Sequence, residues 1–259
     1  MSERLSRAAT QHVVRTVLAA DCACPEAAFV ADGLLVTPAE ERAGRRRYPR
    51  SAKPLGIVTM GRGVVVSCHP DWIASLRTLL ENRSRDEIFA APTMTKLAQF
   101  VAREGQELRG PAVSYACAPE SFRAAATPDG ITISLLEGEE VHDLYQYPGF
   151  ERALSYRPDN PRPDVAAAVA HRAESIVGIA GMSADCEDLW QIGIEVVAGA
   201  RGAGIGRALV GSLTTLAFQR HRVPSYTADV ANLRSHALAV NLGYWPAWVE
   251  LFARELPSA

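Results

Sequence analysis

The stretch with the clearest chemical potential is a glycine-rich turn at residues 199–207. An apolar run ends at Val196-Val197, three glycines follow at alternate positions, and an amphipathic helix is predicted from Gly204. Glycine lets the backbone approach an anion closely, and a helix start presents unpaired N–H groups and the positive end of its dipole. Arg201 and Arg207 add positive charge at the same point. The turn therefore predicts a pyrophosphate-binding cradle.

Two other phosphate-binding motifs do not fit this turn. A dinucleotide fold requires G-x-G-x-x-G, whereas Gly202, Gly204 and Gly206 are spaced two apart. A P-loop requires G-K-[ST], which the chain lacks here. A flexible loop that merely tolerates glycine is the structural alternative.

A second landmark follows the turn at the distance that one known family requires. The residues Arg201-Gly202-Ala203-Gly204-Ile205-Gly206 fit the pattern [RQ]-x-x-G-x-[GA] at every place. Downstream stand Asn232, Ser235 and the sequence Leu242-Gly243-Tyr244, with a predicted strand at 225–230 in between. On these residues the chain resembles the GCN5-related N-acetyltransferase (GNAT) superfamily. The resemblance covers residues 131–259, and the N-terminal half is compatible with a degenerate copy of the same fold.

The resemblance implies a splayed central sheet that binds acetyl-CoA, with no metal. The pantetheine arm would pair with the backbone around Glu195–Val197, and a free amine would attack the thioester directly. The residues implied to contact the acyl-CoA are those of the strand end, the turn, the helix start and the second landmark: Val196, Val197, Arg201, Gly202, Ala203, Gly204, Ile205, Gly206, Arg207, Asn232 and Ser235.

Amine acetylation needs a group that accepts a proton from the amine. Glu195 is the only ionisable residue in the predicted strand Leu189–Val197, and a carboxylate in such an apolar strand needs a partner, water or a task. One hypothesis makes Glu195 the base, and the other makes it an ion-pair partner of Arg201 or Arg207. Three carboxylates in the preceding turn are alternative bases: Asp185, Glu187 and Asp188.

The group that protonates the leaving thiolate is left open by the sequence. Members of the family often carry a tyrosine four residues before the glycine of the second landmark, and this chain has Ala239 there. Ser235 or a water is the candidate acid. His236, which follows on the same predicted helix, is expected to face outward, and Tyr244 is expected to pack.

The elements that must position these groups alternate between strand and helix. The second half is predicted to contain strands at 131–136, 165–171, 176–182, 189–197, 225–230 and 244–252, and helices at 139–144, 204–218 and 234–242. The first half is predicted to hold a hairpin at 55–68, helices at 12–20, 72–82 and from 92, and a strand at 113–118. We therefore expect an α/β protein with a mixed, splayed sheet in residues 126–259, preceded by a smaller α/β domain in residues 1–125.

The composition limits which partners and which cellular compartment we expect for this protein. Residues 1–130 carry 17 basic and 14 acidic side chains, a net of +3, and residues 131–259 carry 10 and 15, a net of −5. The acidic half favours a cationic partner, and the chain lacks the basic bias of a nucleic-acid binder. Five scattered cysteines suggest free thiols, no apolar run is long enough to span a membrane, and a cytoplasmic location is the default. An arginine cluster at 45–47 is expected in an exposed loop.

The sequence thus favours an N-acetyltransferase that moves an acetyl group from acetyl-CoA to a primary amine. A small-molecule acceptor is expected, such as an amino-sugar antibiotic, a polyamine or an amino-acid-like metabolite, and a homodimer is compatible with the chain. The alternative function is a non-catalytic acyl-CoA sensor, which the missing tyrosine at Ala239 keeps open.

Overall fold

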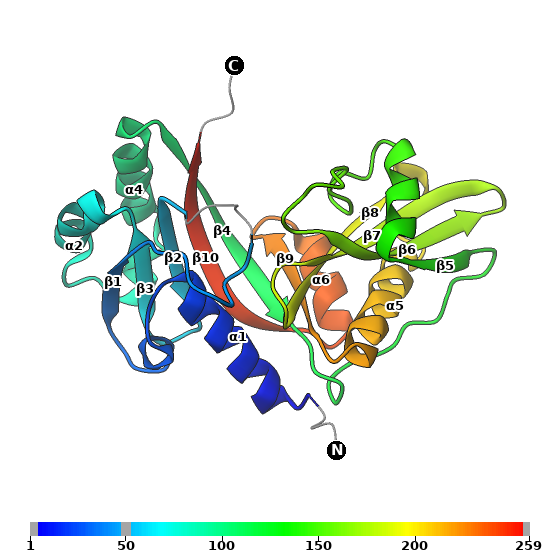
Figure 1. Cartoon of the computed structure of the whole chain (residues 1–259), viewed down its shortest axis with the longest axis horizontal. Helices are drawn as coiled ribbons and strands as arrows, with labels where there is room; N and C mark the ends of the chain where they lie inside the picture. Colours follow the sequence, from blue (N-terminus) through cyan, green and yellow to red (C-terminus); the bar gives the residue numbers. More distant parts are fainter. Residues whose placement is uncertain (1–4, 48–52, 256–259) are drawn as a thin grey trace. The chain divides into compact units, whose positions relative to one another are not determined.

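The computed structural model describes residues 5–47 and 53–255 of the chain (Figure 1). These residues form two compact units, each built on strands and helices. Unit 1 comprises Met1–Val13, Tyr115–Thr227 and Asn232–Trp245, and unit 2 comprises Val14–Ser114, Ala228–Ala231 and Pro246–Ala259. The expected mixed α/β class is confirmed.

Unit 2 is a mixed sheet in the order β1-β3-β2-β10-β4. Its strands are β1 (Leu34–Pro38), β2 (Leu55–Thr59), β3 (Val64–Cys68), β4 (Gln106–Ala116) and β10 (Trp245–Glu255). β1 runs parallel to β3, whereas β2 pairs antiparallel with both β3 and β10. β2 and β3 are buried along their full length and form the expected hairpin.

The helices of unit 2 bury one apolar side each. They are α2 (Ile73–Leu80), the short α3 (Arg85–Ile88) and α4 (Ala91–Arg103), and α1 (Arg7–Asp21) begins in unit 1 and continues here. Leu97 and Val101 of α4 stand four residues apart, and they share one core with Leu76 of α2 and with Ile57 and Val66 of the hairpin. Pro92 lies in the first turn of α4, where its missing N–H costs nothing.

Unit 1 contains the strands in the order β9-β8-β7-β6-β5. They are β5 (Thr132–Glu137), β6 (Asp164–Arg172), β7 (Ser175–Ala184), β8 (Leu189–Val196) and β9 (Val223–Asp229). Neighbours from β5 to β8 are antiparallel, and β8 with β9 is a parallel pair. Such a pair needs a crossover, which α5 (Ile205–Gln219) supplies, and α6 (Leu233–Asn241) follows β9.

The two faces of the unit 1 sheet have different covers. α5 packs on β6, β7 and β8, and the Leu209 side chain lies 3.1 Å from where a Cβ on Gly178 would be. The opposite face carries the 3-10 helix Gly138–Gln146 and the following segment, whose Leu144, Phe150 and Leu154 pack against strand residues such as Ile179. The sheet of unit 1 is therefore sandwiched, with its glycines set where the covers approach.

The two compact units do not coincide with the division expected at residues 125 and 126. The last strand, β10, pairs with β2 at Val249–Phe252 and so joins unit 2, while residues 115–125 and the first turns of α1 join unit 1. Chain order cannot reveal this exchange, because it depends on which strand edge the C-terminal segment completes.

The arginine cluster at 45–47 is only in part the exposed loop that its composition suggests, because Arg47 is exposed but Arg46 is buried. Arg46 is 6% exposed and lies between two carboxylates, with Asp21 Oδ2 at 2.5 Å and Glu250 Oε2 at 2.8 Å. Lys53 Nζ lies 3.5 Å from the same Glu250 oxygen. The Arg46 charge is thus used inside unit 2 and does not form a surface for an anionic partner.

This buried cluster predicts a loss of stability in acid. Burial acts to raise the pKa of Glu250, but the Arg46 and Lys53 charges outweigh it and hold the pKa at about 2, against 4.5 in an unfolded chain. Because the folded pKa is depressed, the stabilisation is complete above pH 4.5 and is lost as the pH falls toward 2. Urea unfolding across this window should show a shallower pH slope for Glu250→Gln than for the parent. Equal slopes, with exposed Glu104→Gln as control, would contradict the assignment.

Candidate active site

The site is built where β8 and β9 separate. Their parallel pairing joins Leu189 to Val223, Trp190 to Pro224 and Gln191 to Ser225, and within the described residues it goes no further. β8 continues alone on that side to Val196, and β9 continues to Asp229. The gap that opens after Gln191 is the splay that the sequence led us to expect.

The backbone of β8 presents polar groups to this gap. Val197 N–H donates to Val177 O of β7 at 3.0 Å, and Asp188 O accepts from Val223 N–H of β9 at 2.8 Å. Because N–H and C=O groups alternate in direction along a strand, those of Ile194 and Val196 point to the β9 side. The Arg201 Nε–H group donates a hydrogen bond to the Val196 carbonyl oxygen at 2.9 Å. The Ile194 N–H and C=O and the Val196 N–H remain for an extended ligand.

This geometry refines the expected contact with a pantetheine arm. The sequence placed the pairing around Glu195–Val197, but the backbone of Val197 is engaged with β7. The groups that an arm can reach lie one residue earlier, on Ile194 and Val196.

The glycine-rich turn leads from β8 into α5 as predicted. Gly202 and Gly204 have φ of +85° and +81°, a left-handed conformation that favours glycine, and a Cβ on Gly202 would meet no atom within 4 Å. Gly204 is the N-cap of α5 and no side chain caps the helix. The first N–H to close onto the helix is that of Ala208, which reaches Gly204 O at 3.2 Å. The N–H groups of residues 205–207 therefore stay available to an anion.

The remaining residues of the turn differ in their exposure to solvent. Arg201, Gly202, Ala203 and Arg207 are exposed, whereas Ile205, the first residue of α5, is buried. A Cβ on Gly206 would lie 3.1 Å from the Leu238 side chain, so this glycine allows close packing between α5 and α6. The cradle thus has charged groups at its mouth and apolar packing beneath.

Glu195 lies on the face of β8 opposite α5. Its strand neighbours Ile194 and Val196 approach Gly206 of α5, so the Glu195 side chain points the other way. There its Oε2 accepts from the Arg152 N–H at 3.4 Å, and the side chain is half-buried. Within the described residues no ion pair joins Glu195 to Arg201 or Arg207, so the role of holding the turn by such a pair has no structural support.

The alternative bases are occupied elsewhere. Glu187 and Asp188 are exposed at the start of β8 and face Arg222, about 20 Å along the strand from Glu195. Asp185 is 3% exposed and contacts Arg162 Nε at 3.4 Å and Ser183 Oγ at 3.0 Å. Glu195 is the carboxylate of this set that lies next to the gap.

The second landmark forms a hydrogen-bonded helix start. Asn232 is the N-cap of α6, and its Oδ1 accepts from Ser235 N–H at 3.3 Å. Ser235 Oγ accepts from the Tyr226 hydroxyl at 3.2 Å, which leaves the serine hydrogen free to be donated. Burial raises the pKa of Tyr226, so its hydroxyl stays protonated at neutral pH. Sequence reasoning missed Tyr226, whose position directly after the last β8–β9 pair becomes visible only from the strand register.

His236 lies on α6 and Tyr244 lies just after it. His236 does not face outward: its Nδ1 lies 2.7 Å from the Tyr115 hydroxyl and the ring is half-buried. Tyr244 packs as expected, 3% exposed, with its hydroxyl 2.6 Å from Thr214 Oγ1. Ala239 is fully buried, and an alanine side chain has no proton to donate, so the position where the resembled family often carries a tyrosine holds no acid here.

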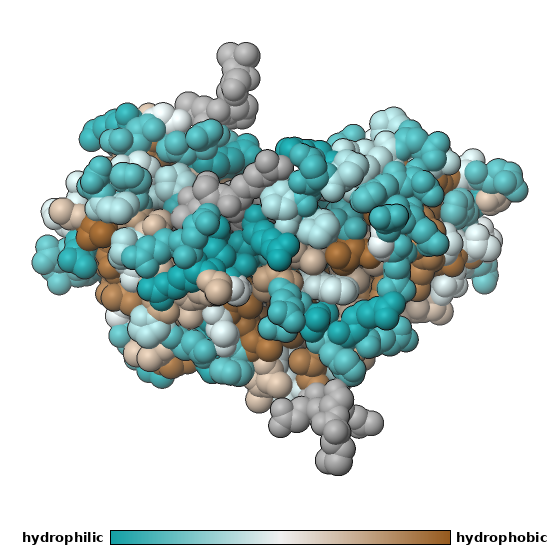
Figure 2. Space-filling model, in the orientation of Figure 1, coloured by the Kyte–Doolittle hydropathy of each residue, from teal (hydrophilic) through white to brown (hydrophobic). Residues whose placement is uncertain are grey.

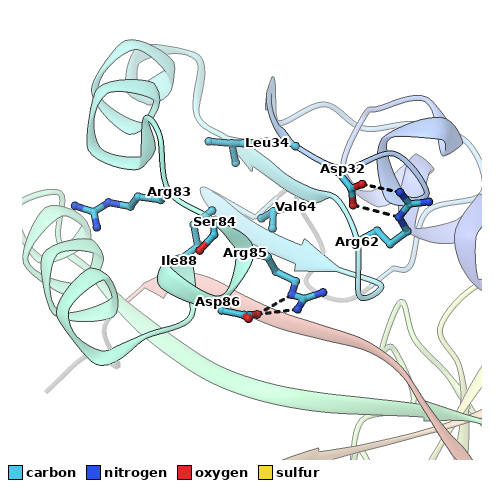
Figure 3. A pocket seen from close by; sticks show the side chains of 10 residues that line it. Asp32, Leu34, Arg62, Val64, Arg83, Ser84, Arg85, Asp86 and Ile88 are labelled. Atoms are coloured by element: carbon cyan, nitrogen blue, oxygen red, sulfur yellow. Dashed lines mark hydrogen bonds and ion pairs between the residues drawn. The ribbon is translucent and has the colours of Figure 1, made fainter.

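A cavity of about 330 Å³ lies in unit 2 and contains no predicted site residue (Figure 3). Its charged groups face one another, with Arg62 bonded to both Asp32 oxygens at 3.1 and 2.6 Å and Arg85 paired with Asp86 at 2.8 Å. Arg62 lies at the hairpin turn, as predicted. Because these ion pairs are internally satisfied, the cavity offers no catalytic arrangement.

Other classes of site are not found in the described part of the chain. No group of three or more metal-ligating side chains comes together in residues 5–47 and 53–255. None of the helices described there is long and apolar enough to cross a membrane. The cysteines at positions 22, 24, 68, 117 and 186 are buried and free, as expected. In the view of Figure 2 the surface of each unit is mainly hydrophilic, with scattered hydrophobic residues.

Comparison with known proteins identifies part of the chain. Residues 135–244 match the sequence model of the Acetyltransferase (GNAT) family, and no curated protein matches the chain. A solved GCN5-related N-acetyltransferase from Kribbella flavida is 18% identical, with a TM-score of 0.46, and the match covers 63% of this chain and 64% of that one. The chain thus spans less than two thirds of that protein's length.

Two other solved structures match more of the chain. A GCN5-related N-acetyltransferase from Sphaerobacter thermophilus is 17% identical, covers 80% of this chain and 78% of that one, and has a TM-score of 0.49. A tandem GNAT protein from the clavulanic acid biosynthesis pathway is 14% identical, and the match covers 99% of this chain and 98% of that one, with a TM-score of 0.49. The matched segment contains β8, the glycine-rich turn, α5, β9 and α6 described above. Residues 135–244 therefore form an acetyltransferase domain of the GNAT family.

Proposed function

We propose that this protein transfers an acetyl group from acetyl-CoA to a primary amine of a small molecule. One observation carries the proposal: the open backbone edge of β8 runs directly into the uncapped N-terminus of α5. An extended polar arm followed by a pyrophosphate matches this order of features, and acetyl-CoA has both.

In this proposal each part of the edge binds a part of acetyl-CoA. The amide groups of the arm pair with Ile194 and with the Val196 N–H, as a further strand would. The pyrophosphate accepts hydrogen bonds from the N–H groups of residues 205–207, and Arg201 and Arg207 neutralise its charge. The thioester then lies toward Gln191, where β8 and β9 begin to separate.

The reaction forms a C–N bond and breaks the C–S bond of the thioester. The amine must lose a proton to attack, and Glu195 is the proposed acceptor of that proton, directly or through a water. The departing thiolate must gain a proton, and Ser235 is its proposed donor, with Tyr226 supplying a replacement through the hydrogen bond to Ser235 Oγ. Positioning the two reactants side by side supplies much of the rate enhancement.

A second function has one observation in its favour. Position 239 holds an alanine, so the usual acid of the family has no counterpart there, which suits a protein that binds acyl-CoA as a sensor and does not turn it over. Binding of acetyl-CoA with no thiol release from any amine would favour the sensor.

Thiol release from acetyl-CoA with a panel of small amines tests the proposed reaction. We expect turnover with primary amines and a rate that rises with pH, because only the unprotonated amine attacks. A cationic acceptor should also react more slowly at high salt, because the ions screen its attraction to the acidic domain. Turnover of neutral hydroxyl compounds alone would reject an amine acceptor.

A further inference from the structure

Two glycines that pair with each other make a flat patch on the sheet face of unit 1 that α5 does not cover. Gly181 of β7 and Gly193 of β8 stand directly opposite in the antiparallel ladder. A Cβ on Gly193 would lie 2.1 Å from the Arg152 carbonyl oxygen, and one on Gly181 would lie 2.0 Å from that of Ala153. The missing side chains therefore let another segment of the chain cross the sheet in direct backbone contact.

This crossing segment, residues 147–156, is anchored by hydrogen bonds near both of its ends. The Tyr156 hydroxyl donates to the Tyr147 carbonyl oxygen at 2.5 Å and so closes the segment on itself. The Ser155 N–H and Oγ donate to Asp164 Oδ2 at 2.7 and 2.8 Å and tie the segment to the start of β6. Its buried apolar side chains belong to the core of unit 1. The segment is thus held in place by contacts that do not involve β8.

The backbone of Arg152 connects the flat patch to the proposed base. Its carbonyl oxygen lies over Gly193, and its N–H donates to Glu195 Oε2 at 3.4 Å. Gly193 and Glu195 point to the same face of β8 and are about 7 Å apart. Because the Arg152 N–H contacts Oε2, it fixes the direction of the carboxylate while Oε1 faces away from this donor. The crossing segment therefore orients Glu195 through a backbone group.

A side chain at position 193 would disturb this arrangement. The atom that it would meet at 2.1 Å is a backbone oxygen of an anchored segment and cannot rotate aside. The segment would have to rise by about 1 Å to restore the 3.0 Å that real Cβ contacts keep. The contact between the Arg152 N–H and Glu195, already 3.4 Å long, would then exceed hydrogen-bonding range. A misplacement of about 1 Å can lower a reaction rate by about a hundredfold.

We propose that Gly193 is a positioning residue for acetyl transfer, because it admits the Arg152 backbone that holds Glu195 in its working orientation. The inference rests on the proposed function, in which Glu195 accepts the amine proton. It adds a residue that touches neither reactant and acts through its neighbour.

A double-mutant cycle between Gly193 and Glu195 tests the inference. Gly193→Ala should lower kcat by at least about tenfold and leave acetyl-CoA affinity unchanged, since the cofactor edge of β8 faces β9. In the Glu195→Gln background the same change should alter kcat by less than about twofold, because the group that it positions no longer takes a proton. Gly56→Ala is the control: it lies in a buried strand of unit 2, and the nearest atom, Lys53 Cδ, is 3.9 Å from its Cβ.

Arg152→Pro provides a second route to the same defect if Gly193→Ala does not fold. Proline removes the N–H that contacts Glu195 and adds no atom above Gly193. The Arg152 N–H is not used in the local turn, whose hydrogen bonds come from the N–H groups of Ala153 and Leu154 to Phe150 O, both at 2.9 Å. This variant should also lower kcat by at least about tenfold in the parent and have little effect beside Glu195→Gln.

The outcomes separate this inference from the proposed function. A folded Gly193→Ala or Arg152→Pro enzyme with the parental kcat would overturn the positioning role. An equal loss in the parent and in Glu195→Gln would also overturn it, because a purely structural defect lowers both rates by the same factor. Failure of every amine to release thiol, or an unchanged kcat in Glu195→Gln, would reject the proposed reaction or its base, and both results come from enzymes that still carry Gly193.

Discussion

Glu195→Gln is expected to lower kcat by about 100-fold or more while leaving acetyl-CoA affinity unchanged. The substitution keeps the shape of the side chain but removes its ability to take a proton from the amine. Glu195 contacts the Arg152 N–H and no arginine of the cradle, so its loss should not disturb the turn that binds the cofactor. A structural role would give the opposite result, with weaker acetyl-CoA binding and a preserved kcat.

Steady-state rates over a range of pH, with calorimetry of acetyl-CoA binding alongside, distinguish these roles. Glu174→Gln is a suitable control, since Glu174 is an exposed carboxylate at the turn between β6 and β7. An unchanged kcat at every pH would remove Glu195 from the mechanism. A proton acceptor would then have to be sought in water or in Asp185, which already contacts Arg162 and Ser183.

The local structure of the glycine-rich turn and of the start of α6 could be predicted from sequence because neighbouring residues encode it. A glycine that needs positive φ, a helix N-terminus and an asparagine N-cap are all encoded within a few residues, so Gly204, Ile205 and Asn232 occupy the places that their types suggested. The apolar runs likewise located β6 to β9, whereas the order of the strands and the parallel pairing of β8 with β9 came from the structure.

The cover on the sheet face opposite α5 could not be predicted because it depends on contacts between distant segments. Gly181 and Gly193 have no unusual φ, and their need for glycine comes entirely from the backbone of Arg152 and Ala153 lying against them. Asp164 reads as the first residue of an ordinary strand until its contacts with Tyr145 and Ser155 are known.

Burial of polar groups was similarly hidden from composition. Arg46 stands in a run of arginines that is typical of a solvent-exposed segment. It is nevertheless buried, because it pairs with Glu250 of β10, which lies 204 positions later in the chain. The outward orientation expected for His236 failed for the same reason, since its partner Tyr115 lies 121 positions earlier. Such pairings become visible only when the strand order is known.

Replacing Gly202 and Gly204 together with aspartate is expected to weaken acetyl-CoA binding by about 100-fold or more. Both positions are exposed and have room for a side chain, so the added groups would fill the space in front of the α5 N-terminus. Two like charges 4 Å apart repel by about 4 kcal/mol at the effective dielectric of a protein surface, and each 1.4 kcal/mol is tenfold in affinity. Even when the repulsion is partly screened, two carboxylates that face a pyrophosphate should therefore weaken acetyl-CoA binding by more than a hundredfold.

Calorimetric titration of acetyl-CoA into the parent and two double variants tests the cradle most directly. The control is Gly44→Asp with Gly105→Asp, because these unit 2 glycines share the positive φ, at +82° and +70°, and the open surroundings of the cradle pair. We predict tight binding by the parent and the control, and a loss of about 100-fold or more for Gly202→Asp with Gly204→Asp. Binding by that folded variant as tight as the parent's would contradict the cradle assignment, and with it the proposed acetyl transfer.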